Sequence, residues 1–151
     1  AALFGTVAAA RAALVHGVAG NLKETSTLDV ELEDAAGDDD VLRALDQYLP
    51  AALDGHAPDL VFYQAGVDAL HTDRLGRLRM THAGLAERDR RVFAWLEARG
   101  LPVCVTLGGG YGRPIESTVT AHANVWRAAR AARERRPAVT PPDTPRQRGL
   151  A

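Results

Sequence analysis

Two residues that can do chemistry follow strongly apolar stretches of this sequence. Asp68 comes two residues after the apolar run 59–66, and Tyr111 lies in the glycine-rich run 108–112, directly after the apolar run 102–107. A carboxylate beside a buried strand is costly to desolvate unless it is paired or bound to a cation. The hydroxyl of a tyrosine in a glycine loop can donate a hydrogen bond to the oxyanion that forms at a reacting carbonyl. The alternatives are a loop aspartate that faces water and a tight turn with an exposed tyrosine.

The glycine run does not match a nucleotide-binding motif. Residues 108–112 have the sequence GGGYG, with no Lys-Ser or Lys-Thr after it and no Gly-x-Gly-x-x-Gly spacing. Those features define the phosphate-binding loop and the dinucleotide-binding fingerprint. Three glycines do permit positive φ angles and a close approach of the backbone to a neighbouring group. An unrelated nucleotide-binding α/β domain is therefore only the weakest alternative.

The five histidines form no metal-binding motif. None of them is four residues from another, and His-Glu-x-x-His does not occur. His71, three residues after Asp68, is the histidine nearest to a candidate site residue in the sequence. We expect His82 and His122 to be surface or packing residues. The Asp73-Arg74 pair is predicted to lie in a solvated loop, which an ion pair between the two residues could support.

Composition limits the classes of function. The 151 residues carry a net charge of −1, which offers no field to attract nucleic acid or an anionic membrane. No apolar stretch approaches the ~20 residues that span a bilayer. The single cysteine, Cys104, cannot form an internal disulfide and lies in an apolar run, where we expect it to be buried. These features fit a cytoplasmic protein that binds neither nucleic acid nor membranes.

The sequence alternates between strand-like and helix-like segments. We predict strands at 27–32, 59–66 and 102–107, with a possible short strand at 12–16. Helices are predicted from about 41, from the N-cap Thr81 to about 99, and over 115–135. Pro50 is expected to kink the first of these helices or to mark its last turn. The 59–66 run is apolar enough to be buried on both faces of a parallel sheet. This order predicts an α/β fold over residues 1–136, followed by a disordered tail at 137–151. Ligands of such sheets bind beyond the carboxyl ends of the strands, where Asp68 and Tyr111 lie.

Several segments resemble the histone deacetylase superfamily, and its bacterial and class IV-like members in particular. They are residues 58–68 and 73–78, the Gly84-Leu85-x-x-Arg88-Asp89 pattern, and Leu107 to Tyr111, all in the family's order. The resemblance covers roughly residues 58–125. It implies a three-layer arginase-like α/β fold and a catalytic zinc, held by two aspartates and one histidine and assisted by two further histidines and a tyrosine.

The resemblance assigns roles to residues that match the family's motifs. Asp68 matches the last zinc-ligating aspartate, and Tyr111 matches the tyrosine that stabilises the tetrahedral intermediate. Gly66, Gly109 and Gly110 match the loops that shape the site. In the chemistry that this implies, zinc polarises an amide carbonyl and activates a water, while the tyrosine hydroxyl takes up the developing charge.

The sequence also departs from the family pattern. The paired histidines and the Asp-x-His zinc motif do not occur, and residues 17–24 lack the aromatic wall of the family's substrate channel. One carboxylate cannot hold a catalytic zinc. We therefore expect a C-terminal portion of a deacetylase-like domain whose N-terminal part is missing.

These observations lead to two functional hypotheses. The first is a zinc hydrolase that removes acyl groups from acetyl-lysine or a similar acylated amine, inactive as an isolated chain and completed by an N-terminal half or by a homo-oligomer. The second is a truncated, non-catalytic α/β module that mediates association. The missing strands would leave a sheet edge or an apolar face exposed in either case.

Overall fold

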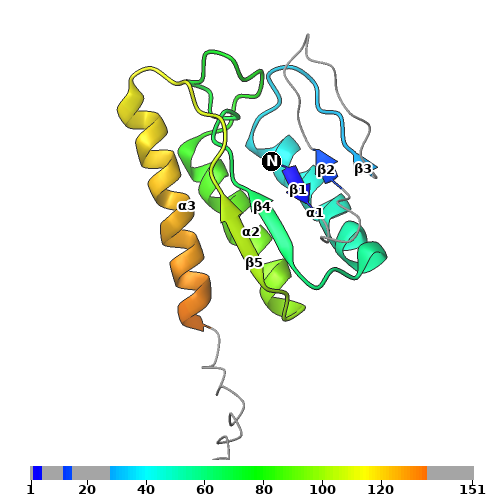
Figure 1. Ribbon diagram of the computed structural model, residues 1–151. Helices are drawn as coiled ribbons and strands as arrows, with labels where there is room; N and C mark the ends of the chain where they lie inside the picture. Colours follow the sequence, from blue (N-terminus) through cyan, green and yellow to red (C-terminus); the bar gives the residue numbers. More distant parts are fainter. Residues whose placement is uncertain (1, 5–11, 15–27, 136–151) are drawn as a thin grey trace, which may run out of the picture.

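The computed structural model describes residues 2–4, 12–14 and 28–135 of the chain (Figure 1). The predictions for the loop at 17–24 and for the tail at 137–151 lie outside these residues. The elements, in order, are β1 (Ala2–Phe4), β2 (Ala12–Leu14), β3 (Leu28–Asp29), α1 (Asp38–His56), β4 (Val61–Gln64), α2 (His82–Ala98), β5 (Val103–Thr106) and α3 (Ile115–Arg135). The predicted alternation of strands and helices is present from β3 onward, although β3 forms only the first part of the strand predicted at 27–32.

The five strands form one sheet in the order β3-β2-β1-β4-β5. β4 and β5, the strands that precede the two candidate loops, are parallel neighbours, with Val61 opposite Val103 and Gln64 opposite Thr106. β2 and β3 are also parallel, and β1 is antiparallel to both β2 and β4. Because β4 and β5 run side by side in the same direction, the loops that follow them leave the sheet at the same edge.

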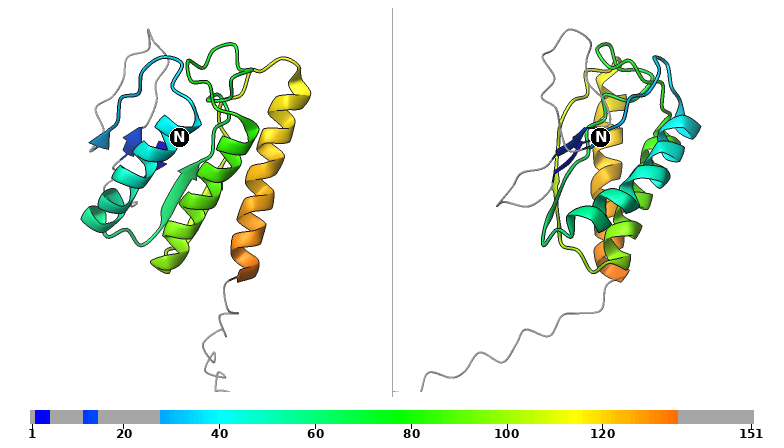
Figure 2. Two further views of the ribbon diagram at one scale, coloured as in Figure 1. Left: turned by 180° about the vertical axis from the view of Figure 1, so that it is seen from behind. Right: turned by 90° about the vertical axis from the view of Figure 1, so that its right-hand side faces the viewer.

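The three helices cover one face of the sheet, as the right-hand view of Figure 2 shows. Val61 and Tyr63 of β4 point to this face and are fully buried, whereas Phe62 and Gln64 alternate with them and are only half-buried. Burial of β4 on both faces, predicted from its apolar composition, is therefore wrong within the described residues. None of the helices described is long and apolar enough to cross a membrane.

Cys104 lies on the face of the sheet that the helices leave open. It is exposed, which corrects the expectation of a buried cysteine. The reason is its register: Cys104 pairs with Phe62, so both side chains point away from the helices. In addition, β5 is the last strand of the sheet, and its outer edge has no neighbouring strand among the described residues.

The ends of the helices follow the predicted local signals, with one exception. Thr81 caps α2 by accepting a hydrogen bond from the amide of Gly84 at 2.9 Å, and Gly100 beyond its last turn has a φ of +65°. The carboxylate of Asp38, in the first turn of α1, accepts from the Thr81 amide at 2.8 Å and thereby joins the starts of both helices. Of the two predictions for Pro50, a kink or the last turn of the helix, the second is wrong, because α1 continues past Pro50 to His56.

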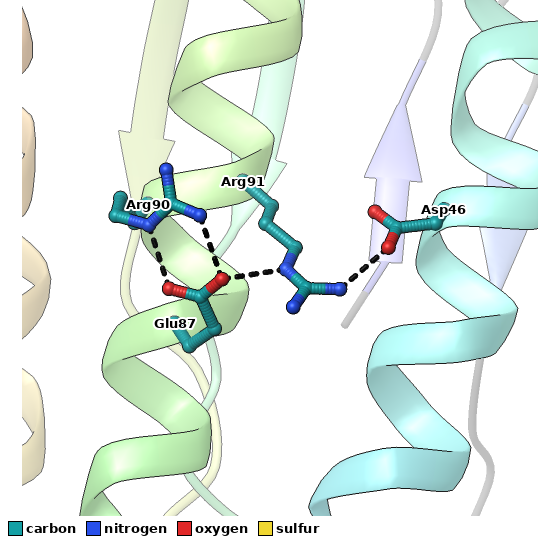
Figure 3. A network of polar contacts seen from close by, with 4 residues as sticks. All are labelled: Asp46, Glu87, Arg90 and Arg91. Carbon is teal, nitrogen blue, oxygen red and sulfur yellow. Dashed lines mark hydrogen bonds and ion pairs between the residues drawn. The ribbon is translucent and has the colours of Figure 1, made fainter.

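Ion pairs join α1 to α2 along their exposed side. Arg91 of α2 donates to Asp46 of α1 and also to Glu87, which accepts in addition from Arg90 (Figure 3). The hydrogen bonds from Arg90 and Arg91 lower the pKa of Glu87 to about 2. Glu87 is therefore the central acceptor of this network.

We predict that Glu87→Gln lowers the free energy of unfolding by about 1 kcal/mol at pH 7, since solvent screens much of the ion pairing. The pKa of Glu87 is lowered from 4.5 in the unfolded chain to about 2. The stabilisation is therefore complete above pH 4.5 and disappears as the pH falls toward 2. Urea unfolding across this range is the measurement, and a difference that does not change with pH would contradict the prediction. Glu134→Gln, at a more exposed pair with Arg130, serves as the matched control with an effect near zero.

Candidate functional site

The two candidate loops meet directly beyond β4 and β5. Backbone pairing continues past both strands, because the amide of Ala65 donates to the carbonyl of Thr106 at 2.9 Å and the amide of Val67 donates to Gly108 at 3.3 Å. The loops therefore leave the sheet in register. This brings the loop that holds Asp68 alongside the glycine run.

Asp68 lies against Gly109, and both residues are where the sequence placed them, at the carboxyl edge of the sheet. The Asp68 side chain is half-buried. Gly109 has a φ of +63°, and a β-carbon added to it would lie 2.6 Å from the carboxyl carbon of Asp68. A β-carbon on Gly66 would lie 2.7 Å from the carbonyl oxygen of Gly108. Glycine is thus required at both positions, because the two loops approach more closely than a side chain would allow.

Tyr111 follows Gly109 by two residues, and its side chain is 55% exposed. Its backbone is held firmly, because its amide donates to Oδ2 of Asp73 at 2.5 Å and its carbonyl accepts from Nε of Arg74 at 3.2 Å. Asp73 and Arg74 are predicted to lie in a solvated loop, where the two residues could pair with each other. That prediction is wrong for Asp73, which is buried at 6% exposure. The structure instead directs the guanidinium of Arg74 to the Tyr111 carbonyl, across the gap between the loops.

His122 of α3 contacts the glycine run, a role that the sequence did not reveal. Its Nε2 lies 3.2 Å from the carbonyl oxygen of Gly109, which requires a proton on Nε2. Gly110, with a φ of +105°, lies so close that an added β-carbon would be 3.2 Å from the same nitrogen. His71, which is nearer to Asp68 in the sequence, has its Nδ1 3.1 Å from the Met80 carbonyl instead. One feature of the sequence could have indicated the role of His122. The predicted helix 115–135 starts directly after the glycine run, so the first turns of that helix have to lie beside the run.

A buried polar network fixes the start of the Asp68 loop. Arg88 of α2 donates through one terminal nitrogen to the carbonyl of Gly66 at 2.8 Å. Its other terminal nitrogen and its Nε donate to Oδ1 of Asp89 at 2.8 and 3.0 Å. The same oxygen accepts from the Tyr63 hydroxyl at 2.5 Å. All three residues are at most 1% exposed, so the network connects α2 to the end of β4 inside the core.

The burial of this network determines its electrostatics. Burial raises the pKa of Tyr63 far above its ordinary value, so the phenol stays protonated and donates to Asp89. Burial acts to lower the pKa of Arg88, but the neighbouring Tyr63 and Asp89 raise it overall. The charge on Arg88 is therefore retained, and the carbonyl of Gly66 receives a charge-assisted hydrogen bond.

The described residues do not make a complete metal centre. Within residues 2–4, 12–14 and 28–135 there is no group of three histidine, cysteine or acidic side chains arranged to hold a metal ion. A catalytic zinc takes three protein ligands. Asp68 provides one candidate ligand, so the donor set of this part of the chain does not by itself fit a catalytic zinc.

Comparison with known proteins gives a consistent match. A family model described as a histone deacetylase domain matches residues 15–128. The chain is 44% identical over 108 residues to an uncharacterized protein of Picosynechococcus, covering 72% of this chain and 36% of that protein. It is 37% identical over 82 residues to histone deacetylase 2 of Arabidopsis thaliana, covering 54% of this chain and 21% of that protein. The chain thus spans about a third or less of the length of these relatives.

Solved structures show the same fold. An acetylpolyamine aminohydrolase from Burkholderia pseudomallei matches 70% of this chain and 29% of its own, with a TM-score of 0.56 and 21% identity. The HD domain of HDA15 matches 68% of this chain and 29% of its own, with a TM-score of 0.53 and 26% identity. The predicted arginase- or deacetylase-like α/β fold is therefore confirmed, in partial form.

We predict that Gly109→Ala destabilises the chain more than Gly100→Ala. Both glycines have a φ near +60°, which costs alanine about 1 kcal/mol, but only at Gly100 would the new β-carbon meet nothing within 4 Å. At Gly109 it would also lie 2.9 Å from the β-carbon of Asp68, so rotating the carboxylate would not relieve the overlap. Urea unfolding should show a further loss of at least about 1 kcal/mol for Gly109→Ala. Equal losses would refute the close approach of the two loops.

A second prediction concerns the buried network. Arg88→Met removes the donor to Gly66 and leaves the carboxylate of Asp89 buried without its cation. Because breaking a buried ion pair costs about 3–5 kcal/mol, we expect a loss of stability in that range by urea unfolding. Arg127→Met, on the exposed side of α3, is the control and should change stability by less than about 0.5 kcal/mol. Similar losses for the two variants would show that the network is not important for stability.

Proposed function

Since this chain belongs to the histone deacetylase family, we propose that it supplies Asp68 as a zinc ligand and Tyr111 as the oxyanion-stabilising group of a hydrolase. The substrate class is an acylated amine, such as acetyl-lysine or an acylated polyamine. One observation carries the proposal: the glycine run seats Gly109 against the Asp68 carboxylate, with Tyr111 two residues beyond. A potential metal ligand and a potential oxyanion donor thereby share one edge of the sheet.

The way in which Tyr111 is held suits the proposed role. Its amide and its carbonyl are both engaged, by Asp73 and Arg74, so the hydroxyl moves only through the torsions of its own side chain. The exposed side chain can reach a ligand without rearrangement of the backbone. A backbone that is fixed in advance leaves less reorganisation to be completed when the hydroxyl meets a transition state.

The proposal requires further metal ligands. Because Asp68 belongs to no three-ligand cluster within the described residues, we propose that the remaining ligands and the acid/base histidines come from outside these residues. A complementary N-terminal half or a second copy of the chain could carry them. Zinc affinity of the chain alone is then weak, and hydrolysis is absent. We also propose a cytoplasmic location, because the single cysteine fits a reducing compartment.

A non-catalytic association module is the second candidate, and one observation favours it. β5 is an edge strand, and large apolar side chains near it and on α3 are at least half exposed. These are Leu107, Ile115, Val119 and Trp126. An open edge beside exposed apolar side chains is typical of a surface that another polypeptide covers.

A chimera tests the catalytic proposal. The matching segment of Arabidopsis histone deacetylase 2 is replaced by that of this chain, and zinc content and hydrolysis of a fluorogenic acetyl-lysine substrate are measured. We expect an active chimera. Asp68→Asn should remove both zinc and activity, whereas Tyr111→Phe should retain zinc and lower kcat by about 10²–10³-fold, the effect of losing one oxyanion donor. Asp59→Asn, at an exposed aspartate outside the candidate loops, is the control and should leave both readings unchanged.

The isolated chain is assayed in parallel, with zinc added. We expect no turnover from it. Stoichiometric zinc binding with robust turnover would contradict the need for ligands from elsewhere. A chimera that folds and binds zinc but stays active as Asp68→Asn and Tyr111→Phe would refute both residue roles. A folded chimera without activity would favour the association module.

A further inference from the structure

The buried carboxylate of Asp73 connects two separate parts of the candidate site. It is 6% exposed, and it accepts three backbone hydrogen bonds. Oδ1 accepts from the amides of Leu75 at 2.8 Å and Gly76 at 2.7 Å, which closes a tight local turn. Oδ2 accepts from the amide of Tyr111 at 2.5 Å, 38 residues away along the chain. The two oxygens therefore have different tasks, one within the turn and one across the loops.

The turn that Asp73 closes also touches Asp68. A β-carbon added to Gly76 would lie 1.7 Å from the carbonyl oxygen of Asp68, so the backbone of the turn is packed directly on the backbone of Asp68. Arg74, the next residue after Asp73, donates to the carbonyl of Tyr111 at 3.2 Å. One short segment thus contacts the backbone of both candidate site residues.

We propose that Asp73 is a positioning residue that sets Tyr111 relative to Asp68, with Arg74 holding the second backbone group of Tyr111. The role of Tyr111 in catalysis rests on the proposed function, but the backbone contacts do not. A carboxylate that accepts from amides at both of its oxygens makes short, charge-assisted hydrogen bonds. Arg74 is exposed, so its contribution is smaller than that of the buried carboxylate.

Asp73→Asn distinguishes the hydrogen bonds within the turn from the hydrogen bond to Tyr111. Asparagine keeps one carbonyl oxygen, which satisfies the two amides of the turn at Leu75 and Gly76. Its amide nitrogen then occupies the place of Oδ2 and presents a donor to the Tyr111 amide, which is also a donor. The variant should therefore keep the turn and lose the contact between the loops.

Amide hydrogen exchange, followed by NMR on the full chain, measures the protection of the Tyr111 amide and of the two amides in the turn. In Asp73→Asn we expect the Tyr111 amide to exchange at least about tenfold faster, as the loss of a hydrogen bond to a charged acceptor implies. The amides of Leu75 and Gly76 should change much less. Asp54→Asn, the same substitution at an exposed carboxylate in the last turn of α1, is the control and should alter none of them. Arg74→Gln should speed exchange at Tyr111 less than Asp73→Asn does.

A measurement on the unmodified chain covers the case in which Asp73→Asn does not fold. A scalar coupling across the hydrogen bond between the Tyr111 nitrogen and the Asp73 carboxyl carbon is expected, and the couplings from Leu75 and Gly76 to the same carbon are internal controls. The absence of the Tyr111 coupling alone, or unchanged Tyr111 exchange in a folded Asp73→Asn, would overturn the proposal. Neither measurement needs zinc or substrate, so an inactive chimera leaves this proposal standing.

Discussion

The buried interaction between Arg88 and Asp89 is the constraint on which the candidate site depends. A charged pair in the core is stable only when its remaining hydrogen-bonding groups are satisfied. Here the surplus donors of the guanidinium reach the Gly66 carbonyl, and the carboxylate takes the Tyr63 hydroxyl. The pair therefore holds the end of β4 in place because its own desolvation requires that contact. The point at which the chain leaves the sheet toward Asp68 is consequently set from inside the core.

From that fixed point, the site is built by contacts between loops rather than by regular structure. The glycine run can lie against Asp68 only because Gly109 has no side chain. His122 holds the run from α3, and Asp73 holds it from the facing loop. The loop after β4 and the helix α3 thus hold one short segment between them, which is how a loop residue such as Tyr111 can be placed accurately.

In the described part of the chain, helices pack on only one face of the sheet. The helices cover a single face of the sheet, and β5 lies at its edge (Figures 1 and 2). The chain spans 36% of the Picosynechococcus relative and 21% of Arabidopsis histone deacetylase 2. Among the described residues, β5 has no neighbour on its outer edge, and Asp68 belongs to no three-ligand cluster.

The sequence by itself determined the order and type of the elements after β1, the cap at Thr81 and the edge of the sheet where Asp68 and Tyr111 lie. Hydrophobic periodicity, capping and strand direction are local properties, so they can be predicted from neighbouring residues. Only the tertiary structure decided that Cys104 is exposed and that His122 and Asp73 hold the glycine run. Exposure depends on which segment covers a face of the sheet. The hydrogen bond from Tyr111 to Asp73 spans 38 residues, and the one from His122 depends on how α3 packs beside the glycine run.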